Sequence, residues 1–361
     1  MGVPGARRAG RAGGFVLVAV LAMLVVLSLL AATIGTITRR LLEAEVERQR
    51  LAQAEIDIAS TRATVLYLLA SQRMTMGGLT VDDQMVLTLD EQEEARGSAL
   101  PQISLTPVGN EIRLDGTAYR GLADIRFSLQ DDRGAIAVNW TTPELLQRLL
   151  EQLGPTVTPV PVLRNLLLDY QDADDLYRIN SAEADGYRQA GLLPPSNRTL
   201  ATPLELRRVM GWRDALAPLD DAALVDTFTV VRSPMLNVNT ASERVLASLP
   251  GVDAAMAARA VAARAVQPFT NLPMFHQLLG VVVPAEEMLS LYPSGSGTLK
   301  LWSAGGGAVH VLHWTLTPLD DGGRPWREDY ELTLSQDGAP VDTVARQVAA
   351  PVLADPPPAS E

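Results

Sequence analysis

The sequence contains no cysteine and only three histidines, so few of the side chains that usually carry chemistry are present. Without cysteine, disulfides and thiolate metal sites are excluded. His310 and His313 lie three residues apart on a predicted strand and therefore face opposite sides, which indicates structural roles rather than a shared metal. Motifs of hydrolases, zinc proteases and phosphate-binding loops are also missing. A membrane-anchored hydrolase would lack a nucleophile with a nearby base, so we expect no catalytic residues and no enzyme.

The sequence also has fewer basic side chains than acidic ones. The 361 residues carry a formal net charge of −12, and Lys300 is the single lysine. An acidic chain repels the phosphates of DNA and RNA. The composition therefore predicts no nucleic-acid partner.

A long uncharged segment, residues 12–38, stands near the N-terminus. About 20 apolar residues suffice to span a bilayer, and the arginines at positions 7, 8 and 11 favour a cytoplasmic N-terminus. A cleaved secretory signal has a shorter apolar region, of about 7–15 residues. A plain membrane anchor explains the length of the segment but not the Gly13-Gly14 pair that opens it.

The start of this segment resembles a type IV pilin-like signal, in which a short basic leader ends in glycine before a long apolar helix. In that family a prepilin peptidase cleaves after the glycine on the cytoplasmic side, which here means between Gly14 and Phe15. Most members carry Glu at the fifth mature position. This chain has Ala19 there and departs from the pattern.

The apolar segment continues as a predicted helix to about residue 72, because residues 39–72 lack Gly and Pro and consist largely of helix-forming residues. Its apolar residues recur mostly at steps of three and four and make one stripe: Leu42, Val46, Ile56, Ala59, Ala63, Leu66 and Ala70. Alternating segments at 111–138, 298–319 and 329–335 predict strands, with turns at the Asp-Gly and Arg-Gly pairs Asp115-Gly116, Arg120-Gly121 and Arg133-Gly134.

Helical segments separate the two sets of strands, which is most simply explained by one sheet with a helical insertion. We therefore expect an α+β, pilin-like fold with a long N-terminal helix that is half transmembrane and half periplasmic, an antiparallel sheet, and a large all-α insertion containing helix-hairpin-helix-like repeats.

The expected parts are a leader at 1–14, the long helix at 15–74 (transmembrane at 15–38), sheet segments at 75–139 and 293–337, the insertion at 140–292 (helix-hairpin-helix-like at 233–281), and a disordered tail at 338–361.

The insertion contains an internal repeat. The segments "VNWTTPELL" (138–146) and "VNTASERVL" (238–246) share a Val-Asn start, and each places a hydroxyl residue, Thr142 or Ser242, at a predicted helix N-cap. Each copy closes on a short predicted helix that ends in glycine, at Gly211 and Gly280.

The second copy resembles a helix-hairpin-helix unit of DNA-uptake proteins, in which the amides of the hairpin bind a phosphate. Pro250 and Gly251 match its turn, but Asp253 replaces the second glycine, and its charge would repel phosphate. Two functions remain open for this unit: a packing module, or a membrane-anchored DNA-binding module of a competence or type IV pilus system.

An acidic loop is the one candidate metal site. Asp169, Asp172, Asp174 and Asp175 lie within seven residues, and carboxylates at such spacing are typical ligands of calcium. Asn180 and Glu183 are candidates to complete the site. The alternative is a solvated loop without an ion, with Arg178 neutralising some of its charge.

Taken together, these features resemble the K-type minor pseudopilins of the bacterial type II secretion system, also called the general secretion pathway. The resemblance rests on the leader with Ala19, on the split sheet with its insertion, and on the segments "DYQDADDLYRINSAEADGYRQAGL" and "LNVNTASERVLASLPGVDAA". It implies a methylated, noncatalytic protein of the inner membrane, single-pass, with its C-terminal domain in the periplasm.

The same resemblance implies a set of partners. These are the I- and J-type minor pseudopilins, the major pseudopilin, the prepilin peptidase and the inner-membrane assembly platform. The implied function is to form the tip of the periplasmic pseudopilus and to support export of folded proteins across the outer membrane. Calcium is the one cofactor implied.

Overall fold

The computed structural model describes residues 13–81, 105–155, 157–284, 286–318 and 323–335, together with residues 346, 348 and 353. The chain divides into two compact units, Met1–Ile56 and Asp57–Glu361. The predicted leader lies outside the described residues except for its last two positions, which begin the first helix.

Helix α1 runs from Gly13 to Ser71, close to the predicted end. In the first unit, every side chain from Val16 to Gln53 is exposed. Val16–Ser71 is long and apolar enough to cross a membrane. The last turns of α1 belong to the second unit, where the side chains of Thr61, Val65 and Leu69 are buried.

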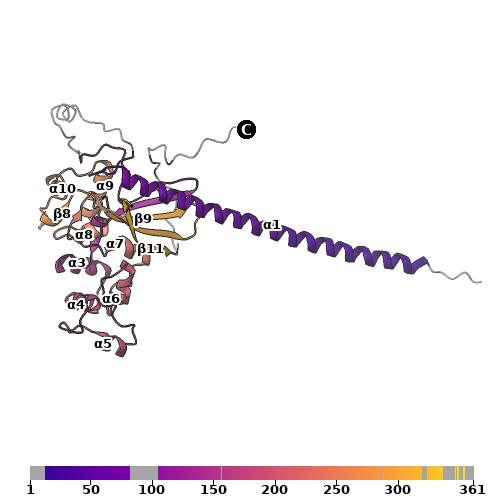
Figure 1. The fold of residues 1–361 in the computed structure, drawn as a ribbon, viewed down its shortest axis with the longest axis horizontal. Helices are drawn as coiled ribbons and strands as arrows, with labels where there is room; N and C mark the ends of the chain where they lie inside the picture. The colour runs from indigo at the N-terminus through magenta and orange to yellow at the C-terminus, as the bar shows by residue number, and fades with distance from the viewer. Residues whose placement is uncertain are drawn as a thin grey trace, which may run out of the picture. The chain divides into compact units, whose positions relative to one another are not determined.

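The head, which we define as the second unit, is built on one five-stranded antiparallel sheet (Figure 1). Its strand order is β11-β10-β9-β4-β3, with β3 at Asp115–Arg120, β4 at Ile125–Asp131, β9 at Ser296–Ser303, β10 at Val309–Leu316 and β11 at Trp326–Leu334. Strands β4 and β9 pair directly, from Ile125↔Ser303 to Asp131↔Gly297. The sheet is therefore assembled from both sides of the insertion, which confirms the predicted fold class. A separate two-stranded ribbon, β1 (Met74–Thr75) with β2 (Gly78–Leu79), follows α1.

The turn predicted at Asp115-Gly116 is wrong. Both residues lie inside β3, where the pairing with β4 shifts between Asp115 and Ala118, and Gly116 has a φ of +80°. Asp115 Oδ1 accepts a hydrogen bond from the Thr117 hydroxyl at 2.6 Å, which fits a bulge rather than a hairpin. The chain reverses instead at residues 121–124. Gly121 is required there because a Cβ would lie 2.6 Å from the Thr61 methyl group on α1.

The insertion is mainly helical, as predicted, but it is not purely α. Its elements are η1 (Asp132–Gly134), β5 (Ile136–Ala137), α3 (Pro143–Leu153), α4 (Val160–Gln171), α5 (Ala184–Gln189), η2 (Pro203–Arg208), α6 (Trp212–Ala215), α7 (Asp221–Thr227), β6 (Phe228–Thr229), β7 (Leu236–Asn237), α8 (Glu243–Ala247), α9 (Ala254–Val266), α10 (Leu272–Leu279), η3 (Glu286–Met288) and β8 (Leu289–Ser290). Two-residue parallel pairs join β5 to β6 and β7 to β8. β5 lies within the segment 111–138 that was predicted to form strands. The other three strands of these pairs were not predicted, because two-residue strands give no strong alternation in the sequence.

Both faces of the sheet are covered. On one face, Phe127, Leu299 and Trp314 pack with the buried side of α1. On the other, Val225 of α7 packs with Val311 and Leu334. The insertion has its own larger core, in which Trp212 and Phe228 meet edge to face.

The predicted disordered tail lies outside the described residues except at three positions, and for those the prediction is wrong. Arg346 forms a parallel bridge with Tyr119 of the edge strand β3, with Arg346 N donating to Ala118 O at 2.9 Å. Val348 and Leu353 are buried in the core of the sheet. Backbone pairing at a free sheet edge and apolar burial outweigh the disorder-prone composition of the surrounding segment.

Candidate functional site

The insertion is a duplicated unit, and the structure shows its boundaries. The first copy opens with β5 and closes with β6; the second opens with β7 and closes with β8. In each copy the predicted hydroxyl residue caps the first helix: Thr142 accepts from Leu145 N, and Ser242 accepts from Val245 N. Both predicted caps are confirmed.

The glycines predicted to close the copies are also confirmed in conformation. Gly211 and Gly280 have left-handed φ values of +77° and +76°. Gly280 ends α10 as predicted. The predicted role of Gly211 as the end of a helix is wrong, because the 3-10 helix η2 ends at Arg208 and Gly211 is the N-cap of α6. Glu205 lies within η2 and accepts from Ala201 N, and Arg198 reaches the same carboxylate at 3.1 Å.

The hairpin between α8 and α9 carries a carboxylate at the start of α9 and is held by an arginine of the first copy. The Asp253 side chain caps α9 by accepting from Met256 N at 2.7 Å. Arg148 of the first copy donates to the carbonyls of Ser248 and Val252 at 3.1 and 3.0 Å. A carboxylate thus stands at the helix N-terminus where an anion would bind, and the nearby arginine holds the two copies together. This geometry favours a packing module over a DNA-binding one.

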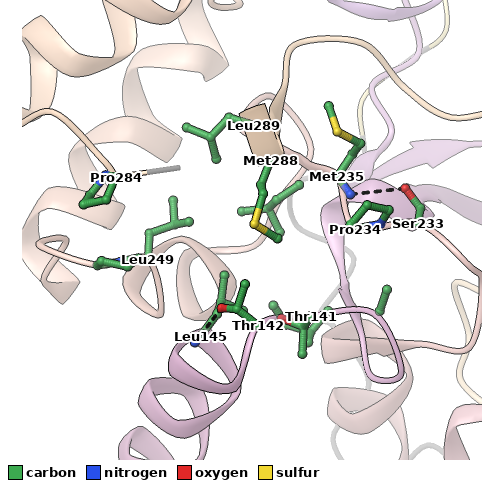
Figure 2. A pocket seen from close by; sticks show the side chains of 14 residues that line it. Thr141, Thr142, Leu145, Ser233, Pro234, Met235, Leu249, Pro284, Met288 and Leu289 are labelled. Atoms are coloured by element: carbon green, nitrogen blue, oxygen red, sulfur yellow. Dashed lines mark hydrogen bonds between the residues drawn. The ribbon is translucent and has the colours of Figure 1, made fainter. Parts of the chain in front are cut away.

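An apolar cavity lies between the two copies. Figure 2 shows Thr142 and Leu145 at the start of α3 on one side and Leu249, Met288 and Leu289 of the second copy on the other. The described residues that line the cavity are apolar or carry hydroxyl groups, and none of them is titratable.

The acidic loop brings together part of the predicted calcium set. Ligand atoms of Asp169, Asp172 and Glu183 lie within 4.8 Å of one another. Asp169 is a buried residue in the last turn of α4, and Glu183 directly precedes α5. Arg178 bridges the two aspartates through its guanidinium, and its backbone N donates to Asp169 Oδ2 at 2.9 Å.

Asp174 and Asp175 do not join this cluster. Both are exposed, and Asp174 Oδ1 accepts from Leu176 N at 2.9 Å in a local turn. Asn180 is exposed as well and adopts a left-handed φ of +57°. Adjacent positions in a loop point to different sides, so proximity in sequence grouped aspartates that the fold separates.

Glu183 shows that the cluster fits a cation. Its side chain is 2% exposed, and neither carboxylate oxygen has a hydrogen-bond partner among the described residues. Burial, and then the charges of Asp169 and Asp172, raise the pKa of Glu183 to about 7. Arg178 pairs with Asp169 and Asp172 but not with Glu183, which leaves a largely buried negative site of the donor type that calcium prefers.

A second buried polar group was not predicted from the sequence. Asp131 accepts from Ser294 N, Ser294 Oγ, Thr240 Oγ1 and Asn237 Nδ2, at 2.7–3.1 Å. It thereby ties the end of β4 to the second copy. The neighbouring Asp132 contacts His313, which lies on β10. The two aspartates form the joint between sheet and insertion.

Comparison with known proteins bears on the duplicated unit. The sequence model of the family described as type II secretion system (T2SS), protein K, matches residues 236–290. The matched segment is the second copy, from the first residue of β7 to the last of β8. This chain is similar to type II secretion system protein K. The match confirms the predicted resemblance, and it supports a minor pseudopilin, which is a structural and noncatalytic component.

A solved structure also aligns with the chain. It is titled the crystal structure of the GspK-GspI-GspJ complex from enterotoxigenic Escherichia coli type 2 secretion system. The alignment has 15% sequence identity and a TM-score of 0.47, and it covers 80% of this chain and 98% of that chain. A search of curated proteins finds no match.

Proposed function

We propose that this chain is a minor pseudopilin of a type II secretion system that forms the tip of the periplasmic pseudopilus and supports export of folded proteins. The observation that carries the proposal is the protein K match, which coincides with one complete copy of the duplicated unit. That unit is inserted in a sheet that packs on a long N-terminal helix, as expected for a pilin-like subunit.

The membrane placement in this proposal rests on α1. Its apolar part would cross the inner membrane once, with the head in the periplasm. The basic leader and Gly14 support cleavage by a prepilin peptidase, which would give a mature N-terminus at Phe15 that is then methylated.

Contacts with other pseudopilins are supported by a free face of α1 in the head. Ala59, Ala63 and Tyr67 follow one another at steps of four and are all exposed, while the opposite face packs on the sheet. Small residues let a second helix approach closely, and Tyr67, at 60% exposed, supplies apolar area. We assign this face to the I- and J-type minor pseudopilins and to the major pseudopilin. The inner-membrane assembly platform would contact the membrane end of α1.

The tip position is supported by Ala19. In pilin-like filaments the usual Glu is thought to neutralise the terminal ammonium of a neighbouring subunit within an apolar helix bundle, where an unpaired charge is costly. A subunit with Ala19 cannot supply that partner and is best placed at the top of the stack. The size of the insertion also supports the tip position, because a shaft of closely packed heads would have to accommodate the insertion in every copy.

Calcium binding is a second proposal, and the unpartnered Glu183 carries it. Asp169, Asp172 and Glu183 would hold the ion. Bound calcium would supply the positive charge that the cluster lacks and would fix the loop between α4 and α5.

The proposed function is tested by complementation of a strain that lacks this protein. The wild-type chain should restore export of folded proteins, and Ala63→Arg on the free helix face should abolish it without lowering Tm. Gln53→Arg, at another exposed position of α1, is the matched control. Normal export without the chain would contradict the proposal. Salt-sensitive binding of duplex DNA by the head at micromolar concentration would instead favour the competence module.

A further inference from the structure

The loop between α4 and α5 exposes its apolar side chains. Leu176 is 74% exposed, Tyr177 58% and Ile179 81%, all within four consecutive residues. Meanwhile the Asp169 carboxylate at the base of the loop is fully buried. Solvated loops normally show the reverse arrangement. Figure 1 shows that α4 and α5 lie at the end of the head away from the sheet.

Hydrogen bonds hold this loop in place. Asn165 Nδ2 of α4 donates to Ile179 O at 2.9 Å, and Arg178 N donates to Asp169 Oδ2 at 2.9 Å. The guanidinium of Arg178 adds a bridge to Asp169 and Asp172. Since the backbone is fastened at Arg178 and Ile179, directly after Tyr177, the fold holds the apolar side chains of the loop in an exposed position. These side chains stay exposed and are not buried by the described part of the chain.

The charge around these side chains is negative. Asp174 and Asp175 are exposed, and neither pairs with a basic side chain in the described part of the chain. The nearest cation in sequence, Arg178, is already engaged with buried carboxylates. An apolar centre with an acidic rim complements a surface that has an apolar pocket edged by Lys or Arg.

We propose that Leu176, Tyr177 and Ile179, with Asp174 and Asp175 as their rim, form a docking surface for a protein whose contact face is apolar and bordered by basic residues. The partner is a protein rather than a membrane, because the exposed carboxylates and the net charge of −12 oppose approach to anionic lipid. The inference goes beyond the proposed function, and it does not depend on calcium.

The test is photo-crosslinking in the native bacterium with the full-length chain. A benzoyl-phenylalanine residue is placed at Leu176 or Ile179, and as the control at Val266, which is 89% exposed at the end of α9. We expect a protein adduct at 176 and 179 whose yield exceeds that at 266 severalfold. Mass spectrometry should place the crosslink in an apolar segment flanked by Lys or Arg.

The second part of the test reverses the charges of the acidic rim. Asp174→Arg with Asp175→Arg should lower the adduct yield severalfold while the crosslinker stays at Ile179. Leu176→Ser with Ile179→Ser should reduce export at unchanged Tm, whereas Val266→Ser should not. The inference is overturned by yields equal to that at 266, by adducts to lipid alone, by a contact segment without basic residues, or by indifference to charge reversal. Should the reversed variant fail to fold, Asp175→Asn alone must still lower the yield.

Discussion

His313 and Asp132 form a buried ion pair that links the sheet to the base of the insertion. Nε2 of the imidazole lies 3.0 Å from Asp132 Oδ2, and Nδ1 lies 2.9 Å from Asp329 Oδ2 on β11. Asp132 Oδ1 also accepts from the Thr229 hydroxyl at the end of the first copy. The joint therefore depends on a positive charge on His313, which makes it sensitive to pH.

Stability of the head should fall as the pH rises through about 9. Burial alone would lower the pKa of His313, but the hydrogen bonds and charges of Asp132 and Asp329 outweigh it and raise this pKa to about 9. In the unfolded chain the imidazole titrates near 6.5. The stabilisation is thus complete below about pH 6.5 and is lost above about 9, with a size on the order of 3 kcal/mol.

Denaturant unfolding of residues 57–361 at a series of pH values measures this effect. His313→Gln should remove the decline between pH 6.5 and 9.5, and His310→Gln should leave it intact. A decline of equal size in the His313→Gln variant would show that another group is responsible.

Asp131→Ala should destabilise the head by about 3 kcal/mol or more. The substitution leaves the buried donors of Thr240 and Asn237, and the half-buried backbone N of Ser294, without this acceptor, and each buried donor left unpaired costs about 1–3 kcal/mol. Asp124→Ala, at an exposed position of the β3–β4 turn, is the control. Thermal or denaturant unfolding compares the two variants; similar free energies of unfolding would mean that Asp131 does not hold the joint.

Calcium should raise the Tm of the head, and Glu183→Gln should abolish that rise. An ion present at about 100 times its Kd stabilises the folded state by about 2.7 kcal/mol. The paired change Asp174→Asn and Asp175→Asn removes two exposed carboxylates and should keep the calcium response. Scanning calorimetry with calcium and with chelator distinguishes the cases, and identical curves for the wild-type head would show that no ion binds.

Without calcium, Glu183 has its own pH signature. Because its pKa is raised to about 7, the folded state is penalised as the pH rises from about 4.5 towards 7. Glu183→Gln should therefore be more stable than the wild-type head in chelator at pH 7.5, though it loses the gain from calcium. This reversal of order between the two conditions would separate a metal ligand from a merely structural residue.

The mature N-terminus should be an N-methylated phenylalanine at position 15. The basic leader, Gly14 and the uncharged segment that follows predict cleavage at this bond. Mass spectrometry of the protein extracted from membranes decides the matter. An intact Met1, or a terminus near residue 33, would mean that no prepilin peptidase acts on the chain.

Sequence patterns predicted those features that local physics decides. The long helix, the caps Thr142 and Ser242 and the left-handed Gly211 and Gly280 each depend on a few neighbouring residues. The joining of β4 to β9 followed from strands that flank a helical block.

Features that depend on distant partners could not be predicted. His313 was expected to be structural because it and His310 face opposite sides of a strand, but its partner Asp132 could not be predicted because it lies far away in the sequence. The apolar stripe expected on the helix splits in the fold: Leu66 is buried against the sheet, while Ala59 and Ala63 are exposed. Asp169 and Asp172 meet Glu183 only because the chain between α4 and α5 folds back on itself.

The position of the chain in the filament tests the central claim most directly. Pseudopili carrying an epitope on the head of this protein would be labelled with gold particles and imaged, and the copies per filament would be counted by quantitative mass spectrometry. The account predicts one copy, labelled at a single end. Label distributed along the shaft, or many copies per filament, would contradict the assignment to the tip.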